Sequence, residues 1–160
     1  MIPQDMIAQI REIMNSARKN TARVVNNEQL LAYWNIGRVI VEHEQNNNER
    51  AEYGKQTLRQ LSRMLTKEFG KGFSLSNVYN MRQFYLDYPK FQSLTGKLTW
   101  THYCELMSIS DRDRRSFYEK ECERSGWSVR SQRLSLKGCC CLRGKLTKKK
   151  CMNWQPKDKS

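Results

Sequence analysis

The chain has 160 residues, enough for one domain with a modest core, and 38% of them are hydrophobic. No apolar run approaches the length of a membrane span and no signal-peptide pattern opens the sequence, so we expect a cytoplasmic protein without a membrane partner. The formal net charge is +13, and its distribution is more informative than its size.

Most of the positive charge lies near the C-terminus. Residues 1–130 contain 20 basic and 15 acidic residues, a net charge of +5, whereas residues 131–160 contain 9 basic residues and one acidic residue, a net charge of +8. Four of the six cysteines also follow residue 130. The sequence therefore predicts a helical domain over residues 1–130 and a basic, cysteine-rich, disordered tail over residues 131–160.

Two helical segments open the chain. The first covers residues 5–25, with an apolar stripe formed by Ile7, Ile10, Met14 and Ala17. The second covers residues 28–44, with a stripe formed by Leu30, Tyr33, Trp34, Gly37, Ile40 and Val41. The intervening Asn26-Asn27 is a weak break, so the two segments form either one long helix or two. Gly37 would weaken a helix unless a neighbouring backbone packs closely against it.

Residues 54–88 predict two short amphipathic helices joined by a tight turn. In the first helix the apolar stripe is Leu58, Leu61, Met64, Leu65 and Phe69, and Gly70 is expected to provide a left-handed C-cap. Ser74 or Ser76 can cap the second helix, which should end before Pro89. Its inward side is predicted to be Leu75, Val78, Tyr79, Met81, Tyr85 and Leu86. Two such helices, the second with an amide-rich exposed face, outline a helix-turn-helix DNA reader.

The second helix of this pair would enter the major groove of double-stranded DNA. Its candidate base contacts are Ser76, Asn77, Asn80 and Gln83, because Asn and Gln side chains can pair bidentately with adenine. The candidate phosphate contacts are Arg59, Arg63, Lys67 and Lys71, which would set the docking register. A solvated helix face is the alternative role for these cations. Arg82 lies toward the apolar side and is predicted to form an internal salt bridge.

Further helices are expected over residues 98–108 and 114–124, with another starting at 126–130. Asp111 and Asp113 are placed to open the second of these. No segment alternates strongly enough to form a long strand, so the predicted fold class is all-α. His102 is expected to be a packing or capping residue. The sequence lacks metal-ligand spacing, a P-loop, a nucleophile elbow and a dinucleotide fingerprint, so we expect no metal, no cofactor and no catalysis by this chain.

The cysteine cluster at residues 139–141 lacks the paired spacing of a metal site. Residues 137–141 must be encoded as AAR GGN TGY TGY TGY. Joining each third base to the next two bases gives a leucine-rich segment in the neighbouring frame. We therefore hypothesise that the tail after about Arg130 is a frameshifted end, which the nucleotide sequence of the gene would test.

Several ordered sequence blocks carry a family resemblance. They are LAYWNIGR at 31–38, YGK at 53–55, residues 58–69, GFS at 72–74 with NMRQFY at 80–85, LTWTHY at 98–103, and FYE at 117–119 through GWSVR at 126–130. Together they resemble the N-terminal domain of the YhcG-type family of PD-(D/E)XK nuclease proteins. The resemblance implies a helical domain that binds DNA and precedes a nuclease domain. This chain lacks that nuclease domain, so the resemblance implies a truncated, non-catalytic fragment.

The alternative function is a protein-interaction or oligomerisation module without direct nucleic-acid binding. The N-terminal helices, with Tyr33, Trp34, Ile36 and Ile40, would then present an apolar face to a partner. That partner is either a second copy, which would form a homodimer through these helices, or another protein. DNA titration against salt and sedimentation of the protein would separate the two functions.

Overall fold

A computed structural model describes residues 4–46, 51–91 and 97–138 of the chain. Within these ranges all regular structure is helical and no strand occurs, which confirms the all-α fold class. The chain divides into two compact units, Met1–Trp100 and Thr101–Ser160. In the same ranges, no helix combines the length and the apolar character needed to cross a bilayer.

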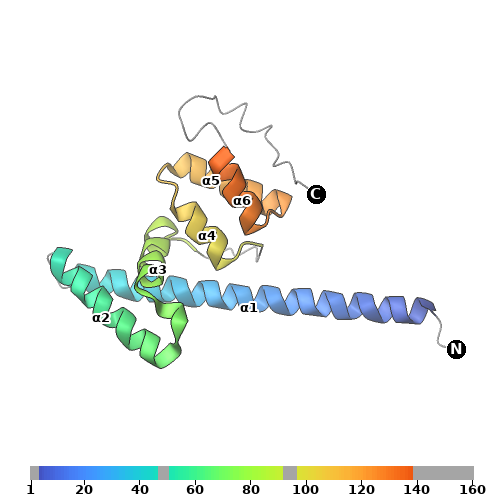
Figure 1. Cartoon of the computed structure of the whole chain (residues 1–160), viewed down its shortest axis with the longest axis horizontal. Helices are drawn as coiled ribbons and strands as arrows, with labels where there is room; N and C mark the ends of the chain where they lie inside the picture. The colour runs from blue at the N-terminus through green and yellow to red at the C-terminus, as the bar shows by residue number, and fades with distance from the viewer. Residues whose placement is uncertain (1–3, 47–50, 92–96, 139–160) are drawn as a thin grey trace. The chain divides into compact units, whose positions relative to one another are not determined.

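The first unit is built on one long helix, α1 (Gln4–Asn46), which has 43 residues and is therefore about 65 Å long. The helix continues through Asn26 and Asn27, so the two predicted segments form one helix. Asn26 instead serves a tertiary role, because its Nδ2 donates a hydrogen bond to the Leu98 carbonyl at 2.7 Å. Every residue from 5 to 25 is exposed, and this half of α1 extends beyond α2 and α3 (Figure 1).

The predicted helix pair is present as α2 (Ala51–Phe69) and α3 (Leu75–Asp87), joined by the short 3-10 helix η1 (Lys71–Phe73). Ser74 caps α3, with its hydroxyl accepting a hydrogen bond from the Asn77 backbone N–H at 3.3 Å. Gly70 adopts φ +93°, which favours glycine, but its ψ of −163° differs from the predicted left-handed helical cap. The hydroxyls of Ser62 and Thr66 donate to the Phe73 carbonyl at 2.8 and 3.0 Å and hold the turn against α2.

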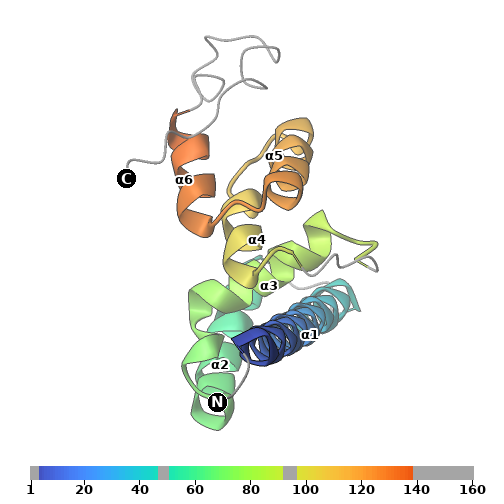
Figure 2. The ribbon, with the colours of Figure 1, turned by 90° about the vertical axis from the view of Figure 1, so that its right-hand side faces the viewer.

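Helix α3 packs closely against α1, and Figure 2 shows the two helices crossing. At the crossing, a Cβ on Gly37 would lie only 2.1 Å from the Met81 carbonyl oxygen, so a neighbouring backbone does pack closely against this glycine. The Arg82 guanidinium pairs with the Glu44 carboxylate of α1 at 2.7 Å, which confirms the predicted salt bridge. These contacts set the rotation of α3 about its own axis.

Because of this rotation, two residues of α3 that were predicted to face the core are exposed instead. Val78, Met81 and Phe84 are fully buried, but Tyr79 and Leu86 are 37% and 38% exposed rather than inward. On α2, Met64 and Phe69 are also exposed, although they belong to the predicted apolar stripe. A helical apolar pattern wide enough to surround half of the helix does not reveal which edge of it the neighbouring helix covers.

The second unit contains most of α4 (Trp100–Met107), together with α5 (Arg112–Ser125) and α6 (Val129–Gly138). Asp111 caps α5 by accepting from the Arg114 backbone N–H at 3.0 Å, and Gly126 ends the helix in the left-handed conformation at φ 61°.

Helix α6 begins at Val129 and continues past Arg130, the residue after which the sequence predicted a tail. Its residues Gln132, Ser135 and Leu136 are buried, so the packed structure includes the first residues of the predicted tail. The cysteine cluster and the remainder of the predicted tail, at 139–160, lie outside the described residues.

Candidate nucleic-acid interface

Three of the four predicted base contacts share one side of α3. Ser76 and Gln83 are exposed and Asn80 is half-buried between them, at spacings of four and three residues. These spacings place the three side chains above one another on a helix surface. The structure thus brings a hydroxyl and two amides together on the side of α3 that does not face α1.

Asn77, the fourth predicted base contact, is engaged inside the first unit. Its side-chain Nδ2 donates to the Gly72 carbonyl, and its Oδ1 accepts a hydrogen bond from the Trp100 indole N–H at 2.7 Å. Both ends of the amide are therefore used to tie the turn and Trp100 to the start of α3. This bridge gives Asn77 a structural role that the sequence pattern did not reveal.

Tyr79 is a candidate that the sequence prediction placed in the core. Its side chain is 37% exposed and lies three residues from Ser76 and four from Gln83. A tyrosine on this face adds an aromatic surface and a hydroxyl that can donate or accept a hydrogen bond. The period of α3 alone could not identify it, because the same residue fits either edge of the apolar stripe.

The predicted phosphate contacts gather on α2 and the turn. Arg59, Arg63 and Lys67 are exposed and recur every four residues, so they form one row along α2. Lys71 is exposed on η1, immediately before α3. The row is thus on the surface, as both the phosphate-binding and the solvated-face interpretations require.

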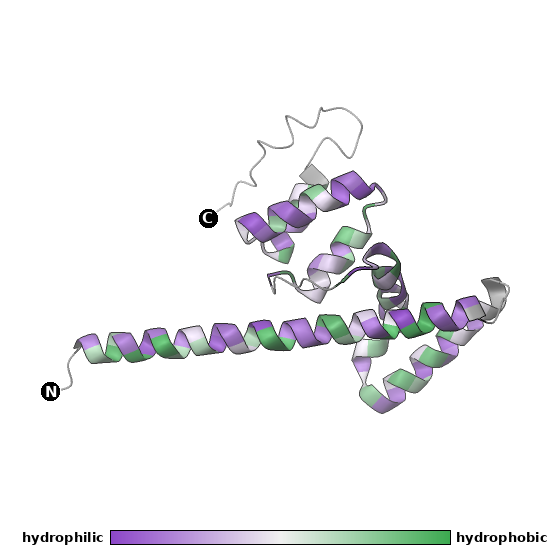
Figure 3. Cartoon of the chain, turned by 180° about the vertical axis from the view of Figure 1, so that it is seen from behind, coloured by the Kyte–Doolittle hydropathy of each residue, from purple (hydrophilic) through white to green (hydrophobic). Residues whose placement is uncertain are grey.

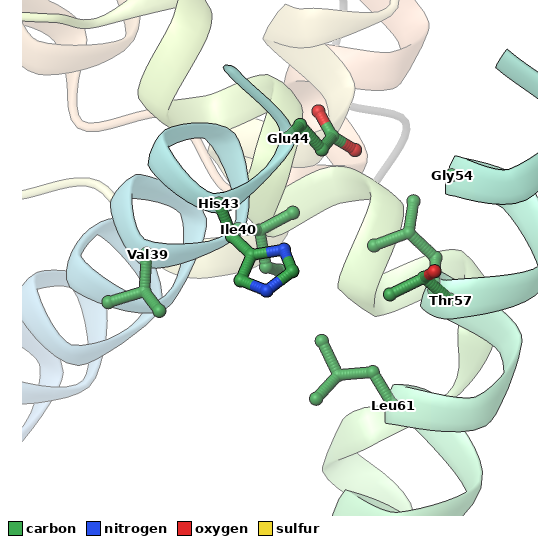
Figure 4. A pocket seen from close by; sticks show the side chains of 8 residues that line it. Val39, Ile40, His43, Glu44, Gly54, Thr57 and Leu61 are labelled. Carbon is green, nitrogen blue, oxygen red and sulfur yellow. The ribbon is translucent and has the colours of Figure 1, made fainter. Parts of the chain in front are cut away.

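An apolar groove runs between α1 and α2. One part, of about 500 Å³, is lined by Ile36, Val39, Leu61, Leu65, Phe69 and Phe73, among others. A second part, of about 190 Å³, includes His43 and Thr57 at its polar edge (Figure 4). The carboxylate of Glu44 borders it but pairs with Arg82. The lining that the structure describes is therefore suited to apolar contact, and its one carboxylate, that of Glu44, is paired with Arg82.

The titratable side chains at the centre of the second unit are packing groups. His102 is buried, with Nε2 3.0 Å from the Trp127 carbonyl, and burial lowers its pKa below 6.5. Burial, reinforced by the nearby carboxylates of Glu119, Glu121 and Glu123, raises the pKa of the Cys122 thiol to about 12. Both groups are therefore held neutral near pH 7. Within residues 4–46, 51–91 and 97–138 no cluster of three or more His, Cys, Asp or Glu side chains could hold a metal ion.

Comparison with known proteins supports the family resemblance. The family described as the DUF1016 N-terminal domain matches residues 9–139. The chain is also 37% identical, over 153 aligned residues, to the Escherichia coli K12 protein named "Putative nuclease YhcG". That alignment covers 76% of this chain and 41% of the relative, so the chain spans less than half of the relative's length. No solved structure matches.

Proposed function

Because the chain belongs to the DUF1016 N-terminal domain family, we propose that it is the DNA-binding module of a nuclease-type protein. The observation that supports this best is the exposed side of α3, where Ser76, Asn80 and Gln83 lie in register. A helix that follows a short turn and presents amide side chains on its exposed side has the outline of a recognition helix. We place this activity on double-stranded DNA in the cytoplasm.

In this proposal α3 enters the major groove and reads base edges. Asn80 and Gln83 pair with adenine through their amides, and Ser76 donates to an acceptor near the start of the helix. Tyr79 adds an apolar contact on the same side. Asn77 supports this face from inside the fold, because it fixes the turn that precedes the helix.

The row on α2, together with Lys71 on η1, supplies affinity rather than sequence preference. Arg59, Arg63, Lys67 and Lys71 contact phosphates and set the position of α3 on the duplex. Each phosphate contact releases counterions, so binding through this row weakens as the salt concentration rises. In this proposal the domain binds the DNA. Cleavage of the DNA backbone is assigned to another part of the nuclease-type protein rather than to this chain.

The test is a selection of duplexes from a random pool, followed by titration of the best duplex against salt. We expect Asn80→Ala or Gln83→Ala to reduce the preference for the selected duplex by about 1–3 kcal/mol per lost bidentate contact. Arg63→Ala should instead weaken all duplexes alike and lower the salt slope by about one. Lys19→Ala, an exposed cation on α1, is the matched control and should change neither quantity.

The basic C-terminal residues require a second control. The titration should be repeated on a chain ending at Gly138, because residues 139–160 carry a net charge that binds any polyanion. A preference unchanged by both Asn80→Ala and Gln83→Ala would show that α3 is not the recognition helix. Absence of duplex binding by the chain ending at Gly138 would refute the proposed function.

A further inference from the structure

We propose that the exposed half of α1 pairs with the same segment of a second copy of this chain, in antiparallel orientation. The inference begins with residues 5–25, all of which are exposed although one side of the helix is apolar. Met6, Ile7, Ile10, Ile13 and Met14 are between 36% and 67% exposed, as are Val24 and Val25. Figure 3 shows hydrophobic segments recurring along this half of α1. An amphipathic helix normally buries such a face.

The spacing of the apolar residues fits a paired helix. Six positions alternate by three and four residues, which is the seam of a two-stranded coiled coil. They are Ile7, Ile10, Met14, Ala17, Thr21 and Val24. Thr21 suits a seam position because its hydroxyl already donates to the Ala17 carbonyl at 3.0 Å within the helix. The segment therefore has a helix as its natural partner.

The area available is that of a specific interface. Covering one large apolar side chain removes roughly 60–120 Å² from water. The seven exposed side chains therefore contribute roughly 400–800 Å² per copy, before Ala17, Thr21 and the stems of flanking arginines are added. A stable pair needs about 600–1,000 Å² per partner.

Antiparallel orientation gives well-filled layers. With Ile7 opposite Val24, Ile10 opposite Thr21 and Met14 opposite Ala17, each layer combines a larger and a smaller side chain. A parallel pair would instead place Ala17 against Ala17 and leave an underfilled layer, which is unfavourable in a packed core.

The position of the first unit's core points to the same orientation. Packing onto α1 begins at Asn26, which bonds Leu98, and at the fully buried Leu30. In the antiparallel register residue 26 lies opposite residue 5 of the second copy. The two exposed halves can therefore overlap completely, while each packed core lies beyond the end of the other helix.

Along one edge of the antiparallel pair, positively charged side chains of the two copies lie next to each other. The register places Arg11 of each copy beside Arg18 of the other, because both lie on the same edge of the seam. The repulsion between these neighbouring like charges opposes pairing, and salt screens it. A parallel pair would place both arginines beside Met6 and Ile13 instead. The orientation can thus be read from the effect of charge reversal.

The test is sedimentation equilibrium of the full chain, without DNA, in reducing buffer and after removal of nucleic acid. We expect a species of twice the 19.0 kDa chain mass, favoured by added salt. Ile10→Asp should give monomers, whereas Ser16→Asp, on the opposite side of α1, should not. A monomeric chain at about 100 µM, or a dimer that survives Ile10→Asp, would overturn the proposal.

Charge reversal tests the register. Arg18→Glu should tighten the dimer roughly 3- to 30-fold, because it replaces two like-charge contacts by two opposite-charge pairs. Arg23→Glu makes the same change in net charge away from the seam and should have a much smaller effect. The double variant Arg11→Glu with Arg18→Glu should lose the gain, because glutamates then face each other. Additive tightening by the two substitutions would contradict the antiparallel register.

Discussion

Gly37 lies where α3 crosses α1 and permits the close approach of the two helices. A methyl group there would lie 2.1 Å from the Met81 carbonyl oxygen, and the obstacle is backbone rather than a movable side chain. We expect Gly37→Ala to lower the free energy of unfolding by about 1–3 kcal/mol, because α1 and α3 must separate. Urea unfolding followed by circular dichroism would measure the loss.

Gly54 provides the matched control for this substitution. It also lies within a helix, α2, but a Cβ added there has no neighbour within 4 Å. Gly54→Ala should raise the free energy of unfolding by up to about 1 kcal/mol through helix propensity. Equal effects of the two substitutions would show that the crossing at Gly37 is not tight.

His102 gives the second unit a dependence on pH. Its folded pKa lies below 6.5, mainly through burial and despite the hydrogen bond to the Trp127 carbonyl. Below about pH 6.5 the unfolded chain therefore binds more protons at this site than the folded chain, and the free energy of unfolding falls as the pH drops. The slope contributed by one histidine cannot exceed about 1.4 kcal/mol per pH unit.

Thermal unfolding between pH 5 and 7.5 would detect this dependence. We expect His102→Gln to flatten the decline of Tm below pH 6.5, since glutamine does not titrate. His43→Gln retains His102 and is the control that should keep the decline. An unchanged decline in the His102 variant would assign the acid sensitivity to other groups.

At the scale of elements, α6 connects the predicted tail to the packed structure. Gln132 is fully buried, and its Nε2 donates to the His102 carbonyl at 3.3 Å. Arg133 pairs with Glu105 of α4 at 2.7 Å. Residues after Arg130 thus contribute to the packing of the second unit.

Truncation separates these residues from the remainder of the tail. A chain ending at Arg130 loses Gln132, Ser135 and Leu136 from the interior, and we expect its Tm to fall by several degrees. A chain ending at Gly138 keeps α6 and these buried residues, so its Tm should exceed that of the chain ending at Arg130. Differential scanning calorimetry of the three chains would measure this, and an equal Tm for the Arg130 truncation would show that α6 is dispensable.

The positions of helices α2 to α5 could be predicted from sequence because their signals are local. Apolar spacing, the Ser74 cap, the Asp111 cap and the glycine turns act within a few residues. The continuity of α1 could not be decided in this way. Asn26 is a poor helix former, but its amide bonds to Leu98, 72 residues later in the chain. Tertiary contact overrides the local preference there.

The candidate interface shows the same limit. Periodicity correctly placed Ser76 and Gln83 on the surface, and the four-residue spacing placed Arg59, Arg63 and Lys67 in one row. It could not reveal that Asn77 bonds Trp100, because that partner lies 23 residues away. Periodicity also could not show that Tyr79 is exposed, because its exposure depends on the rotation of α3 imposed by the crossing at Gly37.

For the whole molecule, the net charge of +13 is a poor guide to the proposed DNA contacts. A net charge of +8 belongs to residues 131–160, whereas the row on α2 belongs to a region that is close to balanced. In the proposal the C-terminal charge therefore adds sequence-independent attraction to that of the row on α2, whereas base reading is assigned to α3. Removal of residues 139–160 should thus lower affinity for every duplex while leaving the preference among duplexes intact.

The crossing of α3 over α1 at Gly37 also defines a length. In the antiparallel pair the two Gly37 positions lie 43 residues apart along a common axis, or roughly 65 Å at the helical rise of about 1.5 Å per residue. That is close to two turns of B-DNA, each about 34 Å. The length of α1 would then set the spacing between the two α3 helices. The matching DNA would be an inverted repeat whose half-site centres are about 20 base pairs apart.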